Sequence, residues 1–401
     1  MWHKKYLASF SILCVVMVIA YSCKKLMPAA APEEHILDGF VEGLNAQQSA
    51  QFLKGDFAFN DELFNSTTGL GPLFVTTSCA SCHAGDGKGH PFSTLTRFGQ
   101  TDSTGNKFLH LGGPQLQNRA LPGYSPERIP TGATFSNFTP PAVTGLGFLQ
   151  HVSDADLLAM ADPTDQDGDD ISGVPNWIDI PSYISVPSNS ITKNGKYIGR
   201  FGKKANAFDL LHQTVNAYNE DMGIASTFHP IDVFSNLEID PEVSNQTVHN
   251  VVFYLQTLKA PIPRNAKDGQ VIFGEKIFKQ IKCDGCHKPT LTTGYSSIAP
   301  LSFKTFHPYT DLLLHDMGSG LDDGYTEGNA LTSEWRTPPL WGLGLSEKSQ
   351  GGQYFLMHDG RAISIEQAIE MHGGEAENSR LQFQKLTTSD RQALIKFLKS
   401  L

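Results

Sequence analysis

The sequence has no surplus of basic residues. Its 401 residues include 31 Lys and Arg against 41 Asp and Glu, which gives a formal net charge of −10. A chain with this balance has no basic face left over to bind phosphates. We therefore expect no nucleic-acid partner.

The N-terminus lacks an apolar run long enough to span a membrane. Lys4 and Lys5 precede an apolar stretch over residues 7–21, which is too short for an ordinary transmembrane helix. A short positive segment followed by such a stretch is typical of a secretory signal. Residues 1–22 are therefore predicted to be a signal peptide.

The end of this stretch resembles a lipoprotein cleavage box, Ala20-Tyr-Ser-Cys23. Cleavage before Cys23 would let its thiol carry a diacylglycerol, with residues 23–40 as a tether. We expect an exported lipoprotein, periplasmic or at the outer membrane, that meets the membrane only through its lipid anchor. A plain signal peptide with an incidental cysteine is the alternative.

Cysteine is scarce, which excludes a disulfide framework. The chain has six cysteines, of which two lie in the first 23 residues. The other four form two pairs, Cys79/Cys82 and Cys283/Cys286. Exported proteins normally use their cysteines in disulfides, but none is left over once both pairs have been assigned. Both pairs need another explanation.

Each pair belongs to the same five-residue motif. The N-terminal motif (residues 79–83) is Cys79-Ala-Ser-Cys82-His83, and the C-terminal motif (residues 283–287) is Cys283-Asp-Gly-Cys286-His287. C-x-x-C-H is the attachment signature of haem c. The two thiols add to the haem vinyl groups, and the histidine becomes the proximal ligand of the iron. The sequence therefore predicts two covalent haems c.

Other uses of a C-x-x-C pair fit less well. A zinc ribbon places its two pairs roughly 15–20 residues apart, whereas these pairs lie about two hundred residues apart. A thioredoxin-like dithiol fits one copy but not two copies that are each followed by histidine. A lipoprotein with zinc or free dithiols and no haem is the remaining alternative.

The surroundings of the two motifs also repeat. Phe74 and Phe278 each stand five residues before the first cysteine of a motif. Apolar residues at helical spacing predict closing helices that end near Leu258 and Leu401. An attachment motif followed by a closing helix outlines a cytochrome c domain.

This repeat predicts an all-α, loop-rich fold of two cytochrome c-like domains in tandem. The N-terminal domain would cover residues 41–262 and the C-terminal domain residues 263–401, with a linker in Ala260-Pro-Ile-Pro263. The 37 glycines and 23 prolines favour long loops. The first domain carries large insertions, and such insertions often hold substrate sites.

Several further motifs occur in a family-specific order. They are Gly113-Pro-Gln-Leu-Gln117, Asp167-Gly-Asp-Asp-Ile-Ser-Gly173, Gly199-Arg-Phe-Gly202, Leu314-His-Asp-Met-Gly318, Arg336-Thr-Pro-Pro339, Met357-His-Asp-Gly-Arg361 and His372-Gly-Gly-Glu375. With these motifs the chain resembles the dihaem oxidoreductases, often called thiol oxidoreductases. That family is distantly similar to the bacterial dihaem cytochrome c peroxidases. The resemblance runs from about Gly39 to Leu401.

The resemblance implies two facing haems, of which one relays electrons and the other meets the oxidant. It also implies that His372 is the distal ligand of the C-terminal haem, opposite His287. The peroxidases have methionine there, and histidine lowers the reduction potential relative to methionine. If His372 is only a loop histidine, Met317 or Met371 takes its place.

Two departures from the family pattern concern the chemistry. Gln150 stands where glutamate is more usual, and glutamine cannot carry a proton for splitting the O–O bond. Lys203 replaces a more usual tryptophan. Three residues are candidates to assist the proton transfers: Glu127, Gln150 and His151. Nothing in the sequence chooses among them.

An acidic run over residues 162–170 has alternating carboxylates around a glycine. Oxygen ligands at i, i+2 and i+4 can converge on Ca²⁺, which makes Asp165, Asp167 and Asp169 candidate ligands. The peroxidase relatives bind calcium between their domains. A solvated acidic loop is the alternative.

Two functions remain open. In the first, the N-terminal haem reduces H₂O₂ or oxidises a partner, with electrons relayed by the C-terminal haem from a small redox protein or a quinol-linked donor. In the second, the protein is a non-catalytic dihaem electron-transfer cytochrome. The sixth ligand of the N-terminal haem is left open among four histidines: His110, His151, His212 and His315.

Overall fold

The computed structural model describes Pro32, residues 35–102 and residues 104–401. The predicted signal peptide, Cys23 and most of the predicted tether lie outside these described residues. Residues 37–401 form one compact unit. No helix in the described part of the chain combines the length and apolar character needed to cross a membrane.

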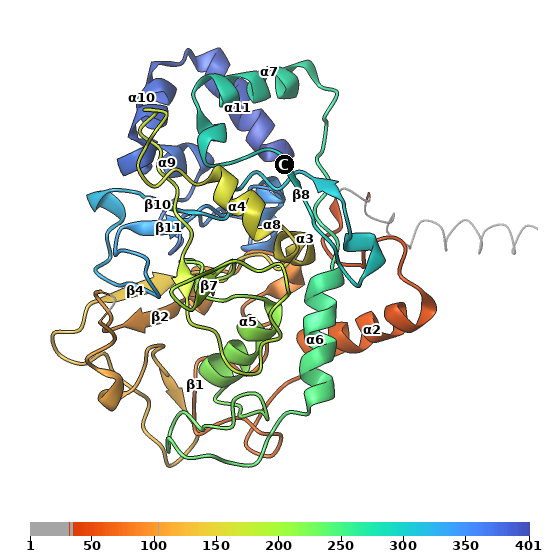
Figure 1. Cartoon of the computed structure of the whole chain (residues 1–401), viewed down its shortest axis with the longest axis vertical. Coiled ribbons are helices and arrows are strands. Elements are labelled where there is room, and N and C mark those ends of the chain that lie inside the picture. The colour runs from red at the N-terminus through yellow and green to blue at the C-terminus, as the bar shows by residue number, and fades with distance from the viewer. Residues whose placement is uncertain (1–31, 33–34, 103) are drawn as a thin grey trace, which may run out of the picture. The chain divides into compact units, whose positions relative to one another are not determined.

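Helices and short strands alternate along the chain (Figure 1). The α-helices are α2 (Ala46–Asn60), α3 (Leu146–Gln150), α4 (Asp154–Met160), α5 (Leu210–Asn216), α6 (Asn245–Thr257), α7 (Gly269–Gln280), α8 (Ser346–Ser349), α9 (Ile365–Glu370), α10 (Glu377–Lys385) and α11 (Thr388–Ser400). Shorter helical turns are η2 (Ala84–Asp86), η3 (Pro91–Ser93), η4 (Leu109–Leu111), η5 (Ala217–Asp221), η6 (Cys283–Gly285), η7 (Ala299–Leu301), η8 (Ser319–Leu321), η9 (Leu343–Leu345) and η10 (Gly374–Ala376).

The expectation of an all-α fold is wrong. The chain is 33% helical and 11% strand. The strands are β1 (Leu73–Phe74), β2 (Leu95–Phe98), β3 (Arg119–Ala120), β4 (Phe135–Phe138), β5 (Trp177–Ile178), β6 (Thr192–Lys193), β7 (Lys196–Ile198), β8 (Leu291–Thr292), β9 (Thr305–Phe306), β10 (Leu314–Asp316) and β11 (Glu334–Arg336). They form small antiparallel sheets with the orders β1-β3, β2-β4, β5-β7-β6, β8-β9 and β10-β11.

The strands are short segments of the chain between helices, which pair with one another through backbone hydrogen bonds. The β6–β7 hairpin closes through Asn194 and Gly195, which both have positive φ (54° and 78°). Asn-Gly is the favoured sequence for such a two-residue turn because both positions need a left-handed backbone. This turn signal is visible in the sequence, whereas the pairing of β2 with β4 across about forty residues is not.

The first helix pair, α2 and α6, forms one half of the repeat. Gly55 of α2 lies against the backbone of Asn250 and the side chain of Tyr254 of α6, where a Cβ would overlap both. The Phe59 ring lies 5.4 Å from the Tyr254 ring. Glycine therefore permits the close approach of the two helices.

The second pair, α7 and α11, repeats this arrangement (Figure 1). Gly274 lies against Ala393 and Phe397, and the Phe278 and Phe397 rings are 5.5 Å apart. The structural equivalent of Phe278 is thus Phe59 rather than Phe74, which lies in β1. The predicted closing helices are confirmed as α6 and α11.

Two large hydrophobic cores accompany the two pairs. One contains residues of α2, α3, α5 and α6, and the other contains residues of α7, α9 and α11. The first core also includes Leu291, Leu301 and Phe306 from the chain that follows the C-terminal motif. It therefore takes side chains from both predicted domains.

Candidate functional site

The N-terminal motif follows β1 and ends where η2 begins. The His83 ring packs against Phe59, with 5.8 Å between the ring centroids. Its Nδ1 lies 2.9 Å from the carbonyl oxygen of Pro141. A backbone carbonyl accepts from Nδ1–H, which leaves the Nε2 lone pair as the ligand atom.

The C-terminal motif overlaps η6 and repeats this geometry. Nδ1 of His287 lies 3.0 Å from the carbonyl oxygen of Tyr309. The Phe278 ring lies 6.5 Å from the His287 ring. Burial lowers the pKa of both His83 and His287 to about 4, so both imidazoles are neutral, as iron ligands must be.

Both motifs open on one cavity of about 440 Å³, called here the shared cavity. All four cysteines and both motif histidines line it. Apolar side chains from both cores make up much of the rest of its wall. Two unpaired thiols, a neutral imidazole with a fixed tautomer and an apolar wall fit a haem at each motif.

The motif cysteines carry protonated thiols in this setting. Cys79, Cys82, Cys283 and Cys286 form no disulfide. Burial raises the pKa of Cys79, Cys82 and Cys283 to about 12. These free thiols are the groups that the two thioethers of each haem c would use.

His372, predicted as a distal ligand, is a wall residue of the shared cavity, and its role as a ligand stays a prediction. It lines the shared cavity beside His287, and the charge of His372 contributes to the lowered pKa of His287. Its Nδ1 lies 2.7 Å from the carbonyl oxygen of Ala368, so Nε2 is again the unpaired nitrogen. Met317 also lines the cavity, whereas Met371 packs against the second core.

The three residues predicted for proton transfer do not line the shared cavity. The Gln150 side chain accepts from the amide of Leu210 at 3.0 Å. Nε2 of His151 lies 3.0 Å from Ser296 Oγ. Glu127 accepts from the amides of Gln117 (2.7 Å) and Gly113 (3.4 Å). Each side chain is thus engaged in local structure.

Carboxylates that the sequence did not single out lie on the cavity wall instead. Asp221 and Glu220 end the π-turn η5 and both line the cavity. Gln115 Nε2 donates to Asp221 Oδ1 at 2.5 Å. Burial raises the pKa of Asp221 to about 7, Gln115 lowers it and Glu220 raises it further. A carboxyl with a pKa near neutrality can both give and take a proton.

Asp221 also lies near the N-terminal motif, because its carbonyl accepts from the amides of Val75 (2.7 Å) and Thr76 (2.9 Å). Its charge raises the pKa of both Cys79 and Cys82. Its neighbour Glu220 pairs with Arg97 at 2.9 Å, and Arg97 also pairs with Glu327 at 2.6 Å. Asp221 and Glu220 belong to a π-turn, and π-turns are frequent at functional sites. The local sequence does not indicate this π-turn.

The four histidines proposed as a sixth ligand of the N-terminal haem lie apart from one another. His110 is exposed, and His151 and His212 are absent from the cavity wall. His315 lines the cavity but contacts the C-terminal motif, since its Nδ1 lies 3.4 Å from Cys286 Sγ. Asp311 (2.9 Å) and Glu375 (2.6 Å) flank its ring.

Lys203 stands where the family more usually has tryptophan, but another tryptophan, Trp335, lines the cavity. Trp335 stacks on His358 with 3.7 Å between the ring centroids. The Lys204 ammonium lies 3.9 Å from the centroid of the Trp335 ring. A cation over the ring opposes removal of an electron from it, because both carry positive charge.

The acidic run brings Asp165 and Asp167 together with Asp162, within 4.8 Å of one another by their ligand atoms. Asp169 is not part of this group, and its side chain accepts from the amide of Ile171. Asp162 in turn accepts from the amide of Gln166 at 2.7 Å. Calcium binding by this run stays a prediction.

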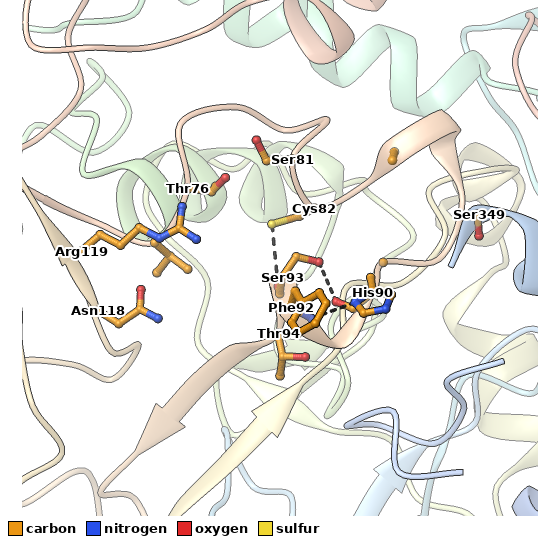
Figure 2. Close-up of a pocket in the computed structure, with 13 residues that line it drawn as sticks. Thr76, Ser81, Cys82, His90, Phe92, Ser93, Thr94, Asn118, Arg119 and Ser349 are labelled. Atoms are coloured by element: carbon orange, nitrogen blue, oxygen red, sulfur yellow. Dashed lines mark hydrogen bonds between the residues drawn. The ribbon is translucent and has the colours of Figure 1, made fainter. Parts of the chain in front are cut away.

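A smaller pocket of about 210 Å³ lies on another side of Cys82 (Figure 2). Figure 2 shows the Cys82 sulfur directed at the Ser93 carbonyl, 3.8 Å away, with His90 and Phe92 beside it. Cys82 lines both this pocket and the shared cavity.

Comparisons with known proteins extend this description. The chain shows 15% identity to a Kuenenia stuttgartiensis hydrazine synthase structure (94% of each chain covered, TM-score 0.40). It shows 14% identity to the diheme peroxidase BthA from Burkholderia thailandensis (92% of this chain and 93% of that chain covered, TM-score 0.42). A search of curated proteins gave no match.

The family described as "Di-haem oxidoreductase, putative peroxidase" matches residues 136–236 and 231–401. The matched stretches include the C-terminal motif, His372 and the cavity-lining residues of η5. Together they cover more than half of the chain. The chain therefore belongs to the di-haem oxidoreductase family.

Proposed function

We propose that the protein is a dihaem c-type peroxidase that reduces H₂O₂ at the N-terminal motif with electrons relayed through the C-terminal motif. Cys79 and Cys82 hold one haem by thioethers, and Cys283 and Cys286 hold the other. The net reaction is H₂O₂ + 2e⁻ + 2H⁺ → 2H₂O. A bound haem supplies the iron that binds the oxidant and stores the electrons.

One observation carries this proposal, namely that both motifs line the same cavity. Motifs about two hundred residues apart in the chain thus share one space. Such an arrangement supports electron exchange between two haems within one molecule. His372 beside His287 supports a six-coordinate C-terminal haem that stores and relays electrons.

The protein's own residues supply protons and position the oxidant. Asp221 is our candidate for the proton donor, because it lines the cavity near the N-terminal motif. Gln115 orients its carboxyl group. The Arg97 cation, held by Glu220 and Glu327, lies on the same wall and can stabilise negative charge that develops on oxygen.

The alternative is an electron relay without catalysis. Gln150 and Lys203, in place of the family's more usual glutamate and tryptophan, favour it. The polar wall of Asp221, Glu220 and Arg97 opposes it, because an electron relay has no use for buried proton donors. In either case the donor would be a small redox protein or a quinol-linked donor outside the cytoplasm.

The direct test uses the whole protein matured with haem c. Optical and EPR spectra are recorded in the oxidised and half-reduced states, before and after H₂O₂. Two haems per chain by pyridine haemochrome, with a high-spin signal that H₂O₂ removes, are expected. Two low-spin haems that ignore H₂O₂ in both states would support the electron relay and contradict the catalytic proposal.

The variant His372→Met tests the ligand of the C-terminal haem. Methionine favours ferrous iron relative to histidine, so one midpoint potential should rise by at least about 59 mV, a tenfold change in the ferric-to-ferrous ratio. Potentiometric titration measures this shift, and Met371→Leu, off the cavity, is the control. Unchanged potentials and EPR spectra in His372→Met would show that another residue is the ligand.

A further inference from the structure

Besides the exposed Lys282, three partly buried cations line the shared cavity without a salt bridge to any described residue. They are Lys88, Lys203 and Arg336, called here the cation cluster. The Lys88 and Lys203 ammonium groups also form no hydrogen bond within the described part of the chain. Two other cations of the cavity wall differ, since Arg97 pairs with Glu220 and Arg380 with Glu377.

The three groups are close enough to affect one another. Burial lowers the pKa of Lys203 well below its usual value, and Lys88 and Arg336 lower it further. Among the described carboxylates, Asp359 is the one that raises the pKa of Lys203. Asp359 is itself held by Arg361 at 2.7 Å. The described residues therefore give the three groups no salt-bridge partner, and an anion beside Lys203 would favour its charged form.

The backbone holds two members of the cluster together. The amide of Arg336 donates to the Lys203 carbonyl at 2.9 Å, and Arg336 Nε donates to the Gly202 carbonyl at 2.8 Å. Arg336 Nη1 donates to the Thr337 carbonyl at 3.2 Å. The guanidinium is thus anchored along one edge, which leaves its Nη2 for a ligand.

Buried charge without a counter-ion is costly, so an anion is expected in the space that the cluster faces. Lys203 contributes to the lowered pKa of His83. Arg336 pairs in β11 with Leu314 of β10, the neighbour of His315, whose Nδ1 lies 3.4 Å from Cys286 Sγ. The cluster therefore extends between the two motifs. The anions that two haems bring into this cavity are their propionate carboxylates.

We propose that Lys88, Lys203 and Arg336 form the binding site for haem propionates between the two motifs. Arginine and lysine recognise carboxylates through charge-assisted hydrogen bonds. This inference rests on the proposed haem occupancy of the shared cavity but not on peroxidase turnover. It also gives a reason for lysine at position 203, where the family more commonly has tryptophan.

The test is a potentiometric titration of Lys203→Gln in the holoprotein, without peroxide. A cation beside a haem disfavours ferric iron, so its removal should lower one midpoint potential. The expected shift is at least tenfold in the ferric-to-ferrous ratio, which is about 59 mV for one electron. Both haems should remain attached by pyridine haemochrome.

Two further variants keep the test specific. Lys203→Arg retains the charge and should retain the wild-type potentials, whereas Lys276→Gln removes an exposed charge of α7 and should change neither potential. Unchanged potentials in Lys203→Gln would overturn the proposal. So would a new ferric EPR signal in both Lys203→Gln and Lys203→Arg, because it would make Lys203 an iron ligand. The H₂O₂ test decides peroxidase function separately.

Discussion

Replacing Asp221 with asparagine is expected to lower the rate of H₂O₂ turnover by about 10²–10⁴-fold, the usual contribution of a positioned acid or base. Asparagine can still pair with Gln115 but carries no transferable proton. Both haems should stay attached. Steady-state turnover with an artificial electron donor, normalised to haem content, measures the effect.

The pH dependence gives a second readout of the same variant. Burial raises the pKa of Asp221 to about 7, so the proton donor is present below this pH and is lost as the pH rises through it. Wild-type turnover should therefore fall above pH 7, and the asparagine variant should lack this decline. A spectroscopic change in the haems without a change in the pH profile would indicate a structural role.

Matched variants separate Asp221 from other carboxylates. Asp240→Asn changes an exposed aspartate away from the cavity and should leave turnover unchanged. Glu127→Gln tests the residue predicted from the sequence. A loss of turnover in Glu127→Gln, with none in Asp221→Asn, would assign the proton transfer to Glu127 and contradict our assignment.

Removing the carboxylate of Asp154 is expected to destabilise the fold by about 3–5 kcal/mol. Asp154 forms a salt bridge with Arg200, and both side chains are less than one-tenth exposed. The Arg200 guanidinium also donates to the carbonyls of Val152 and Ile198. Asp154→Ala would leave this buried cation without its counter-ion. The free energy of unfolding from urea titrations measures the loss.

An exposed ion pair provides the control. Glu275 and Lys279 of α7 lie 2.8 Å apart with about half-exposed side chains. Glu275→Ala should cost less than about 0.5 kcal/mol, because solvent screens such pairs. Equal losses in Asp154→Ala and Glu275→Ala, at equal haem content, would show that the buried pair contributes no more than a surface pair.

Much of the helical framework could be predicted because its signals are local. Apolar residues at helical spacing predict α6 and α11. The small strands could not be predicted in the same way, because β2 and β4 consist of four residues each and pair across a long insertion. The all-α expectation failed where short segments between helices pair with one another, both in the first predicted domain and, as β8-β9 and β10-β11, in the second.

The equivalence of Phe74 and Phe278 failed for a related reason. Both stand five residues before a cysteine, but an inserted segment with β1 separates α2 from the N-terminal motif. Phe59 therefore takes the place beside Tyr254 and His83 that counting residues assigned to Phe74. Sequence spacing finds a repeat only where no insertion falls inside it.

The sequence by itself determined the family and the haem-binding motifs, because thioether and iron ligation need a fixed order of neighbouring residues. It also singled out His372 through its motif, and the role of this residue as an iron ligand stays a prediction. Only the tertiary structure decided that both motifs share one cavity and that Asp221, Arg97 and the cation cluster line it. Those residues come from distant segments, and their proximity depends on how loops and helices pack rather than on local spacing.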